Sequence, residues 1–200
     1  MTLLKEKIKK HRVILGSASP RRNYLLRGLD FDFTVETNGE IPEDFDPSIK
    51  AEDVPLLLSQ RKSRMFHREL EKEELLITAD TLVICNGEIL GKPEGREDAI
   101  SMLSKLSGKE HLVVTGVTIR TIAKEDGFWA QTKVMFKPLS MDEIVYYVDN
   151  YKPYDKAGSY GAQDWIGYTA IRSIEGSYFN VVGLPVERLS EELLLFLDHH

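Results

Sequence analysis

Two hydrophobic patterns alternate along nearly the whole sequence, and this alternation predicts an α/β fold. Short apolar runs typical of strands are followed by segments whose apolar residues recur at helical spacing. We expect strands over residues 12–16, 31–36, 75–85, 111–123, 128–136, 170–174 and 178–182. We expect helices over residues 20–28, 52–71, 97–106, 141–150 and 186–196.

Two turns indicate that part of the sheet is antiparallel. Asn86 and Gly87 separate two apolar runs, and both tolerate the positive φ of a type I′ hairpin turn. A second hairpin is expected over residues 111–136, across a turn at residues 124–127. Together with the helices, these hairpins predict a mixed twisted sheet with flanking helices. We expect two lobes around a cleft, within a single domain that covers residues 1–200.

The composition excludes several classes of protein. The chain is 42% hydrophobic and 29% charged with a net charge of −6, which is typical of a soluble globular protein. This acidic balance argues against binding to nucleic acid, which needs a basic surface. No apolar stretch reaches the roughly 20 residues that cross a bilayer, and the start of the chain lacks a secretory signal. We therefore expect a cytoplasmic protein without a membrane partner. The single cysteine, Cys85, excludes an intrachain disulfide and is expected to be buried.

The first predicted strand stops at small hydroxyl residues that are followed by two arginines. Ser17 and Ser19 precede Pro20, a residue favoured at the first position of a helix, so that the free N–H groups of the helix start can bind an anion. Arg21 and Arg22 add forked donors that match the geometry of phosphate. An N-capping serine followed by a solvated basic turn is the alternative, and this motif alone does not decide between them.

Two further segments carry single charges at unusual places. Asp80 lies within a very apolar predicted strand, where a carboxylate without a partner would be costly to bury, so we expect it to meet a metal, a water or a cation. A structural aspartate bonded to backbone amides is the alternative. Lys92 stands between Gly91 and Pro93 in a turn, as a point charge suited to phosphate or simply as an exposed lysine.

The acidic loop at residues 38–46 and the long predicted helix each offer one more candidate. The loop gathers four acidic residues, enough to supply a second carboxylate beside a hard divalent cation, although such loops are more often merely solvated. Lys62 lies on the helix between Arg61 and Arg64, whose charges are mostly expected to face water.

The glycine-rich segment at residues 156–163 leaves its backbone open to a flat ligand. Gln163 follows two glycines and has a side-chain amide that both donates and accepts, as recognition of a nucleobase requires. A simple connection between a helix and a strand is the alternative. Taken together, the basic loop, the turn lysine, the carboxylates and this amide are an inventory suited to a metal-bound nucleotide.

The sequence resembles the Maf family of nucleoside triphosphate pyrophosphatases over nearly its whole length. Five segments, in this order along the chain, carry the resemblance: residues 17–26, 79–81, 91–93, 157–163 and 176–185. The resemblance implies the fold shared by Maf and inosine triphosphatase-like proteins, with the nucleotide bound in the cleft between the lobes. It also implies hydrolysis of a nucleoside triphosphate to the monophosphate and pyrophosphate with Mg²⁺ or Mn²⁺, and assembly into a homodimer.

The resemblance also implies roles for individual residues. Asp80 matches the family's catalytic aspartate, which accepts a proton from water, binds metal or does both. The positions matching phosphate contacts are Ser17, Arg21, Arg22 and Lys92, and the helix lysine matches Lys62. Family members commonly show Ile-Asp-Glu in the acidic loop, where this chain reads Ile41-Pro42-Glu43. Glu43 is therefore the candidate for the second metal-binding carboxylate, with Glu40 and Asp44 as alternatives.

The implied substrates follow from three residues. Gln163, together with Arg21 and Thr81, resembles the subgroup that acts on dTTP and UTP, whether normal or modified. The alternative from another class is a regulatory nucleotide-binding protein that controls septum formation, which would bind the triphosphate without releasing pyrophosphate. A nucleotidyltransferase ranks behind both, because Gly16 is the only glycine before Arg21 and the glycine-rich first loop of that class is absent.

Overall fold

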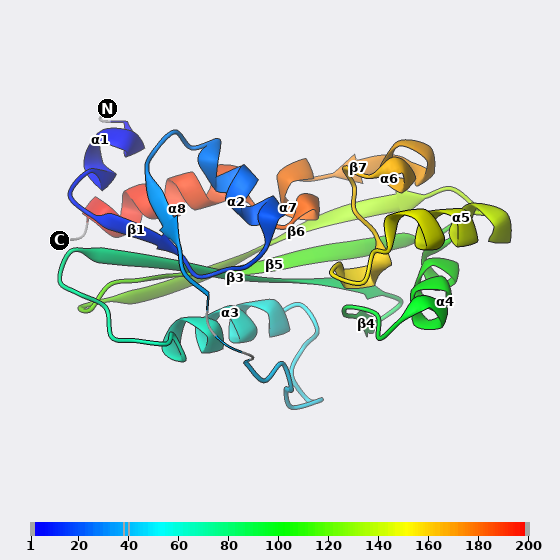
Figure 1. Cartoon of the computed structure of the whole chain (residues 1–200), viewed down its shortest axis with the longest axis horizontal. Helices are drawn as coiled ribbons and strands as arrows, with labels where there is room; N and C mark the ends of the chain where they lie inside the picture. The colour runs from blue at the N-terminus through cyan, green and yellow to red at the C-terminus, as the bar shows by residue number, and fades with distance from the viewer. Residues whose placement is uncertain (1–2, 38, 40, 199–200) are drawn as a thin grey trace. The chain divides into compact units, whose positions relative to one another are not determined.

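A computed structural model of the chain describes residues 3–37, 39 and 41–198 (Figure 1). The strands are β1 (Arg12–Leu15), β2 (Phe33–Val35), β3 (Glu74–Cys85), β4 (Glu88–Leu90), β5 (Glu110–Arg120), β6 (Glu125–Phe136) and β7 (Ile171–Glu175). The helices are α1 (Leu4–Ile8), α2 (Pro20–Arg27), α3 (Val54–Arg64), α4 (Arg96–Leu106), α5 (Met141–Tyr151), α6 (Trp165–Ala170), α7 (Tyr178–Val182) and α8 (Val186–Asp198), with a 3₁₀ turn, η1 (Ala157–Ser159).

Within the described residues these strands form one mixed sheet, which confirms the predicted fold class. Its order is β2-β1-β3-β5-β6-β7, and β4 pairs with β3 off this path. β1 runs parallel to both β2 and β3, with Val13 opposite Phe33 on one side and Leu75 on the other. β4 and β7 are antiparallel to β3 and β6.

The hairpin predicted at Asn86 and Gly87 is confirmed. Their φ angles are 52° and 79°, and Cys85 pairs with Glu88 directly across the turn. Both positive angles are those that a type I′ turn demands. The second predicted hairpin joins β5 to β6, but its turn lies earlier than expected, since the Thr121 N–H donates to the Lys124 carbonyl over 2.8 Å and β6 already begins at Glu125.

Two predicted elements were wrong in type or length. Residues 178–182 form helix α7 instead of a strand, and the Asn180 side chain at its centre donates to the Val113 carbonyl and to the Thr132 hydroxyl. The helix predicted over residues 52–71 ends at Arg64, because Phe66 and Leu70 turn back to pack with Ile14 and Leu76. Residues 178–182 carry four apolar residues around Asn180, which is typical of a short strand. Residues 65–71 mix apolar and charged residues, which is typical of an amphipathic helix.

The chain forms two compact units. The first comprises Met1–Asp80, Thr115–Ala130 and Gly183–His200, and the second comprises Thr81–Val114 and Gln131–Val182. β3, β5 and β6 contribute residues to both. Two units agree with the two predicted lobes, whereas the cleft between them and the single-domain boundary stay predictions.

In the first unit, α3 and α8 lie on opposite sides of the strands (Figure 1). In the second unit, α4 packs against α5 and η1, over a core that contains Leu103, Phe136 and Tyr147. Cys85 is buried at the end of β3, as predicted. None of the described helices is long and apolar enough to cross a membrane.

Candidate active site

The loop between β1 and α2 forms the helix start that the sequence predicted. Ser19 is the N-cap of α2, its hydroxyl accepts from the Arg22 N–H over 3.4 Å, and Pro20 occupies the first turn. Ser17 is 9% exposed, and its hydroxyl accepts from the Ser19 N–H over 3.3 Å. These two hydroxyls fix the loop and set the direction of α2.

Arg22 is tied to three places in the first unit. Its Nε donates to the Gly183 carbonyl over 2.9 Å, and its Nη1 donates to the Ala79 carbonyl over 2.8 Å and to the Ser17 hydroxyl over 3.4 Å. Burial lowers the pKa of the Arg22 guanidinium, and the charges of Asp80 and Glu43 act in the opposite direction. Arg22 therefore joins the loop at residues 16–19, which we call the serine loop, to the middle of β3, and it places a positive charge close to both carboxylates.

Two buried hydroxyl contacts position α3 against the sheet of this unit. The Thr78 hydroxyl on β3 donates to the Ser59 carbonyl over 2.8 Å, and the Ser59 hydroxyl lies 2.8 Å from that of Thr118 on β5. Asp80 lies two residues beyond Thr78, on the same face of the strand. Lys62 lies three residues beyond Ser59, on the same face of the helix. These bonds therefore align the faces that carry Lys62 and Asp80.

Lys62 lies between two carboxylates. Its Nζ forms ion pairs with Asp80 Oδ1 and with Glu43 Oε1, the latter at 2.9 Å. The side chains of Asp80 and Lys62 are 9% and 17% exposed, whereas that of Glu43 is 48% exposed. The partner that a buried Asp80 needs is thus an ammonium in this structure, and Glu43 meets the same ammonium from the acidic loop.

The acidic loop is held by a residue whose role the sequence did not reveal. Arg61 Nη1 donates to the carbonyls of Pro42 over 2.6 Å and Asp44 over 2.7 Å, and lies 3.3 Å from Asp44 Oδ1. Arg61 therefore fixes the backbone on both sides of Glu43. Of the two alternative carboxylates, Asp44 pairs with Arg61, and Glu40 lies outside the described residues. The sequence places Arg61 beside Lys62 on the predicted helix but does not show the partners of Arg61, since they lie 17 and 19 residues away.

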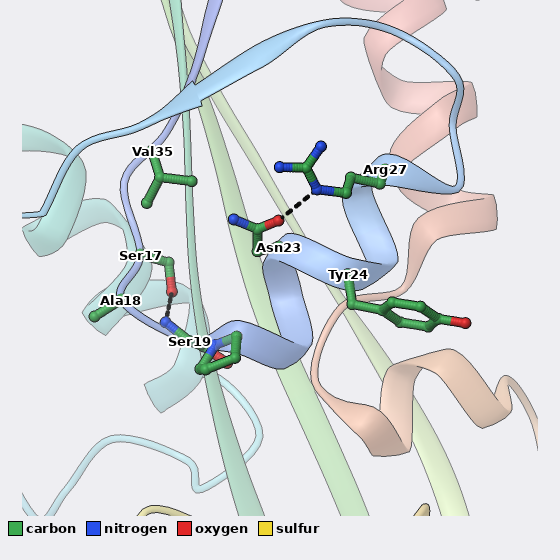
Figure 2. A pocket seen from close by; sticks show the side chains of 8 residues that line it. Ser17, Ala18, Ser19, Asn23, Tyr24, Arg27 and Val35 are labelled. Atoms are coloured by element: carbon green, nitrogen blue, oxygen red, sulfur yellow. Dashed lines mark hydrogen bonds between the residues drawn. The ribbon is translucent and has the colours of Figure 1, made fainter.

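A cavity of about 440 Å³ lies beside the serine loop (Figure 2). Its lining residues come from the loop, from α2 and from β2: Ser17, Ala18, Ser19, Pro20, Asn23, Tyr24, Arg27 and Val35. In Figure 2 the Arg27 guanidinium donates to the Asn23 side chain, over 2.9 Å. Of the predicted site residues that the structure describes, Ser17 alone lines this cavity, and Asp80, Glu43 and Lys62 do not.

The other three predicted site residues belong to the second unit. Thr81 follows Asp80 directly in β3, Lys92 is exposed in the turn after β4, and Gln163 is half-buried before α6. The Gly158 N–H donates to the Gly91 carbonyl over 3.0 Å, so the turn that bears Lys92 is bonded to the glycine-rich segment. The structure thus gathers Ser17, Arg22, Glu43, Lys62 and Asp80 in one unit, with Arg21 on the same helix start, and describes Thr81, Lys92 and Gln163 in the other.

Gln163 lies in a network of polar contacts within the second unit. Its Nε2 donates to Asp164 Oδ1 over 3.3 Å, while Asp164 Oδ2 accepts from the Tyr147 hydroxyl over 2.8 Å. The Gly161 N–H donates to the same hydroxyl over 3.1 Å. Burial raises the pKa of Tyr147, so its hydroxyl remains a donor at neutral pH. Neither Asp164 nor Tyr147 was singled out from the sequence, since an aspartate before a helix is typical of a simple cap.

The donor set of the first unit fits a hard divalent cation. Among the described residues no group of three or more His, Cys, Asp and Glu side chains converges on one point. Mg²⁺ nevertheless needs only one or two carboxylates when substrate phosphates and water complete its octahedron. Asp80 and Glu43 reach one common ammonium, so both can face one cation.

Comparison with known proteins places the chain in a family. A protein of Bacteroides fragilis named dTTP/UTP pyrophosphatase is 48% identical over 184 residues, covering 92% of this chain and 95% of its own. A protein of the same name from Phocaeicola vulgatus is 48% identical over 188 residues, covering 94% and 97%. A solved dITP/XTP pyrophosphatase from Mycobacterium abscessus covers 93% of this chain and 98% of its own at 13% identity and a TM-score of 0.43, a similarity too low to bear on the site. The sequence profile of Maf-like proteins matches residues 12–196, and the chain therefore belongs to this family.

Proposed function

We propose that this protein is a nucleoside triphosphate pyrophosphatase that hydrolyses dTTP and UTP, including modified forms of these pyrimidine nucleotides, to the monophosphate and pyrophosphate. The observation that carries the proposal is the ammonium of Lys62 between Asp80 and Glu43, in the same unit as the serine loop and its arginines. Relatives that share nearly half of their residues with this chain bear the name of that activity.

The reaction breaks one phosphoanhydride bond. A water oxygen bonds to the α-phosphorus, the bond from that phosphorus to the α,β-bridging oxygen breaks, and pyrophosphate leaves with the electron pair. In our proposal Asp80 accepts the proton of this water. Arg21, Arg22, Lys62 and Lys92 neutralise the charge of the phosphates, and Ser17 adds a hydroxyl hydrogen bond to them. Such preorganised cations and donors usually supply most of the catalysis in phosphoryl chemistry.

A divalent cation, Mg²⁺ or Mn²⁺, is part of this proposal. Asp80 and Glu43 would hold it, and when bound it supplies charge neutralisation at the phosphate oxygens. Lys62 keeps these two carboxylates together within the protein itself. We also carry over from the family resemblance that Gln163 reads the base, that Thr81 contacts the substrate, and that the protein is a homodimer. From the sequence itself we propose that it acts in the cytoplasm.

Pyrophosphate release from a panel of triphosphates tests the proposal. We expect metal-dependent release from dTTP and UTP in preference to CTP, dATP, GTP and 7-methyl-GTP, and none in EDTA. The Asp80→Asn variant should lose at least about 10²-fold in kcat, because a positioned base contributes ~10²–10⁴-fold. Asp53→Asn is the matched control, since Asp53 precedes α3 and makes no side-chain cap bond. Binding of triphosphate without any release would favour the regulatory alternative.

A further inference from the structure

The two ends of a glutamine amide have opposite hydrogen-bonding character, so the way round in which the amide lies decides which groups of a bound base it can pair with. The oxygen accepts a hydrogen bond, and the nitrogen donates. If Gln163 reads the base, as the proposed function has it, then the direction in which its amide lies decides which bases it favours. The residue that sets this direction is therefore a determinant of specificity.

Asp164 sets this direction by its chemistry. A carboxylate only accepts hydrogen bonds, so the end of the Gln163 amide that faces it must be the nitrogen. Gln163 Nε2 lies 3.3 Å from Asp164 Oδ1. The other carboxylate oxygen is fixed by the Tyr147 hydroxyl at 2.8 Å, and Lys156 Nζ lies 3.8 Å from it. Asp164 offers Gln163 an acceptor in every orientation, and its contacts with Tyr147 and Lys156 hold it in place.

The ordinary structural role for Asp164 does not account for its position. Asp164 is the N-cap residue of α6, where an aspartate usually accepts a hydrogen bond from the first turn of its own helix. Its side chain makes no such bond. Both oxygens instead contact side chains outside α6, one of them that of Gln163.

The neighbouring glycine makes room for this arrangement. A Cβ built on Gly161 would lie 2.6 Å from Asp164 Oδ2 and 2.7 Å from Gln163 Nε2, closer than real atoms approach. The carboxylate and the amide are therefore packed against a bare Cα. Any other residue at this position would push apart the two groups that the hydrogen bond joins.

The opposite end of the amide is left without a partner. Gln163 Oε1 is buried and accepts no hydrogen bond from any of the described residues. An unsatisfied buried acceptor costs about 1–3 kcal/mol. A ligand that displaces the atoms covering Gln163 Oε1 and brings a donor to it recovers this cost. Uracil and thymine carry a hydrogen on N3, whereas N3 of cytosine carries a lone pair and no hydrogen.

We propose that Asp164 is a positioning residue for base selection: by holding the Gln163 nitrogen, it presents the Gln163 oxygen to the N3–H of uracil or thymine and disfavours cytosine. This inference rests on the proposed function. Asp164 accepts from the Gln163 nitrogen, and Tyr147 holds Asp164 in place. The Gln163 amide, which can both donate and accept, therefore acts toward the base as an acceptor.

The test is the ratio of kcat/KM for UTP to kcat/KM for CTP. In Asp164→Asn the new amide can accept or donate, so Gln163 can lie either way round. We expect the ratio to fall about tenfold, because the Gln163 oxygen is no longer held toward the base. The kcat for UTP should stay within about threefold of the wild type, because no phosphate contact changes. Asp149→Asn is the matched control: it removes a carboxylate charge of the second unit that pairs with Arg96, so its ratio should equal that of the wild type.

A double-variant comparison separates positioning from a general loss of order. In a Gln163→Leu background, Asp164→Asn should leave the ratio unchanged, since no amide remains to be oriented. An equal fall in both backgrounds would overturn the inference, as would an unchanged ratio in Asp164→Asn alone. Should Asp164→Asn fail to fold, Tyr147→Phe decides, because it keeps the buried ring and removes the hydroxyl that holds Asp164, and an unchanged ratio there counts against the inference.

Failure of the inference and failure of the proposed function give different results. A wild type that releases pyrophosphate from UTP, with a ratio that no Asp164 variant alters, overturns the role of Asp164 alone. A wild type that releases no pyrophosphate from any triphosphate overturns the proposed function, and the inference with it.

Discussion

At the scale of single residues, the candidate site depends most on the ion pair between the buried Asp80 carboxylate and the Lys62 ammonium. Asp80 is buried on a strand of apolar residues and forms an ion pair with the Lys62 ammonium. Breaking a pair of this kind costs more than the pair contributes, because the remaining charge stays away from water. Lys62 is thus important for the stability of the first unit as well as for its proposed chemistry.

We predict that Lys62→Met lowers both activity and stability. The loss of its ammonium leaves Asp80 and Glu43 facing each other, and we expect a loss of about 2 kcal/mol in the free energy of unfolding. Urea denaturation measures it. Lys105→Met is the control, because Lys105 forms an exposed ion pair with Glu88, a type worth about 0–1 kcal/mol. Equal losses in the two variants would contradict this role of Lys62.

His111 gives a second prediction at this scale, concerning pH. Burial lowers its pKa to about 4, and its Nε2 lies 2.8 Å from the Tyr160 hydroxyl. In the unfolded chain a histidine titrates near 6.5. Between about pH 6.5 and pH 4 the unfolded state therefore binds more protons, so stability falls as the pH is lowered through this range and is fully present above it.

We expect this single group to account for up to about 3 kcal/mol between pH 7 and pH 4. Unfolding free energies measured across this range for the wild type and for His111→Gln should diverge as the pH rises, the wild type gaining more. Parallel curves would mean that His111 takes up its proton equally in both states.

At the scale of elements, the position of α3 depends on one glycine. A Cβ built on Gly116 of β5 would lie 2.2 Å from the Leu56 nitrogen and 2.3 Å from the Pro55 carbonyl carbon. Backbone atoms cannot turn aside as a flexible side chain does. The bare Gly116 thus lets α3 lie close enough for the Ser59–Thr78 and Ser59–Thr118 contacts.

We predict that Gly116→Ala costs about 3 kcal/mol or more of stability, above the usual range for overpacking because backbone has to move. Activity at low temperature should also fall, since α3 carries Lys62. Gly95→Ala is the control, because a Cβ there meets nothing within 4 Å. Thermal unfolding compares the two, and equal midpoints would show that α3 adjusts freely.

Element prediction succeeded where local chemistry was strong. Ser19-Pro20 and Asn86-Gly87 dictate a helix start and a turn whatever surrounds them, and both lie where expected. It failed where distant partners decide: Asn180 holds α7 through Val113 and Thr132, and Phe66 ends the stretch after α3 by entering the core. For the same reason the sequence offered Asp80 and Lys62 as candidates without their contact, and it gave no sign of Arg61 or Asp164.

At the scale of the whole molecule, the two units are connected by shared strands. β3, β5 and β6 each pass from one unit to the other, so no cut in the sequence separates the units. Elements that share continuous hydrogen-bonded strands are expected to unfold together.

The two tryptophans report on the two units separately. Trp129 belongs to the first unit and Trp165 to the second. We predict that Trp165→Phe and Trp129→Phe, each followed by the fluorescence of the remaining tryptophan, give the same denaturation midpoint in guanidinium chloride once corrected for the stability of each variant by circular dichroism. Two clearly separated midpoints would show that the units unfold independently.

The interlaced order of the segments also sets the order in which the units can form during synthesis. A ribosome releases the chain from its N-terminus, and every segment of the second unit has been made once Val182 has emerged. The first unit, although it begins the chain, still lacks Gly183–His200, which carries α8 and the carbonyl that accepts from Arg22. The unit that holds the serine loop and Asp80 therefore becomes complete only after Gly183–His200 has emerged, later than the second unit, although Glu43, Lys62 and Asp80 themselves are made much earlier.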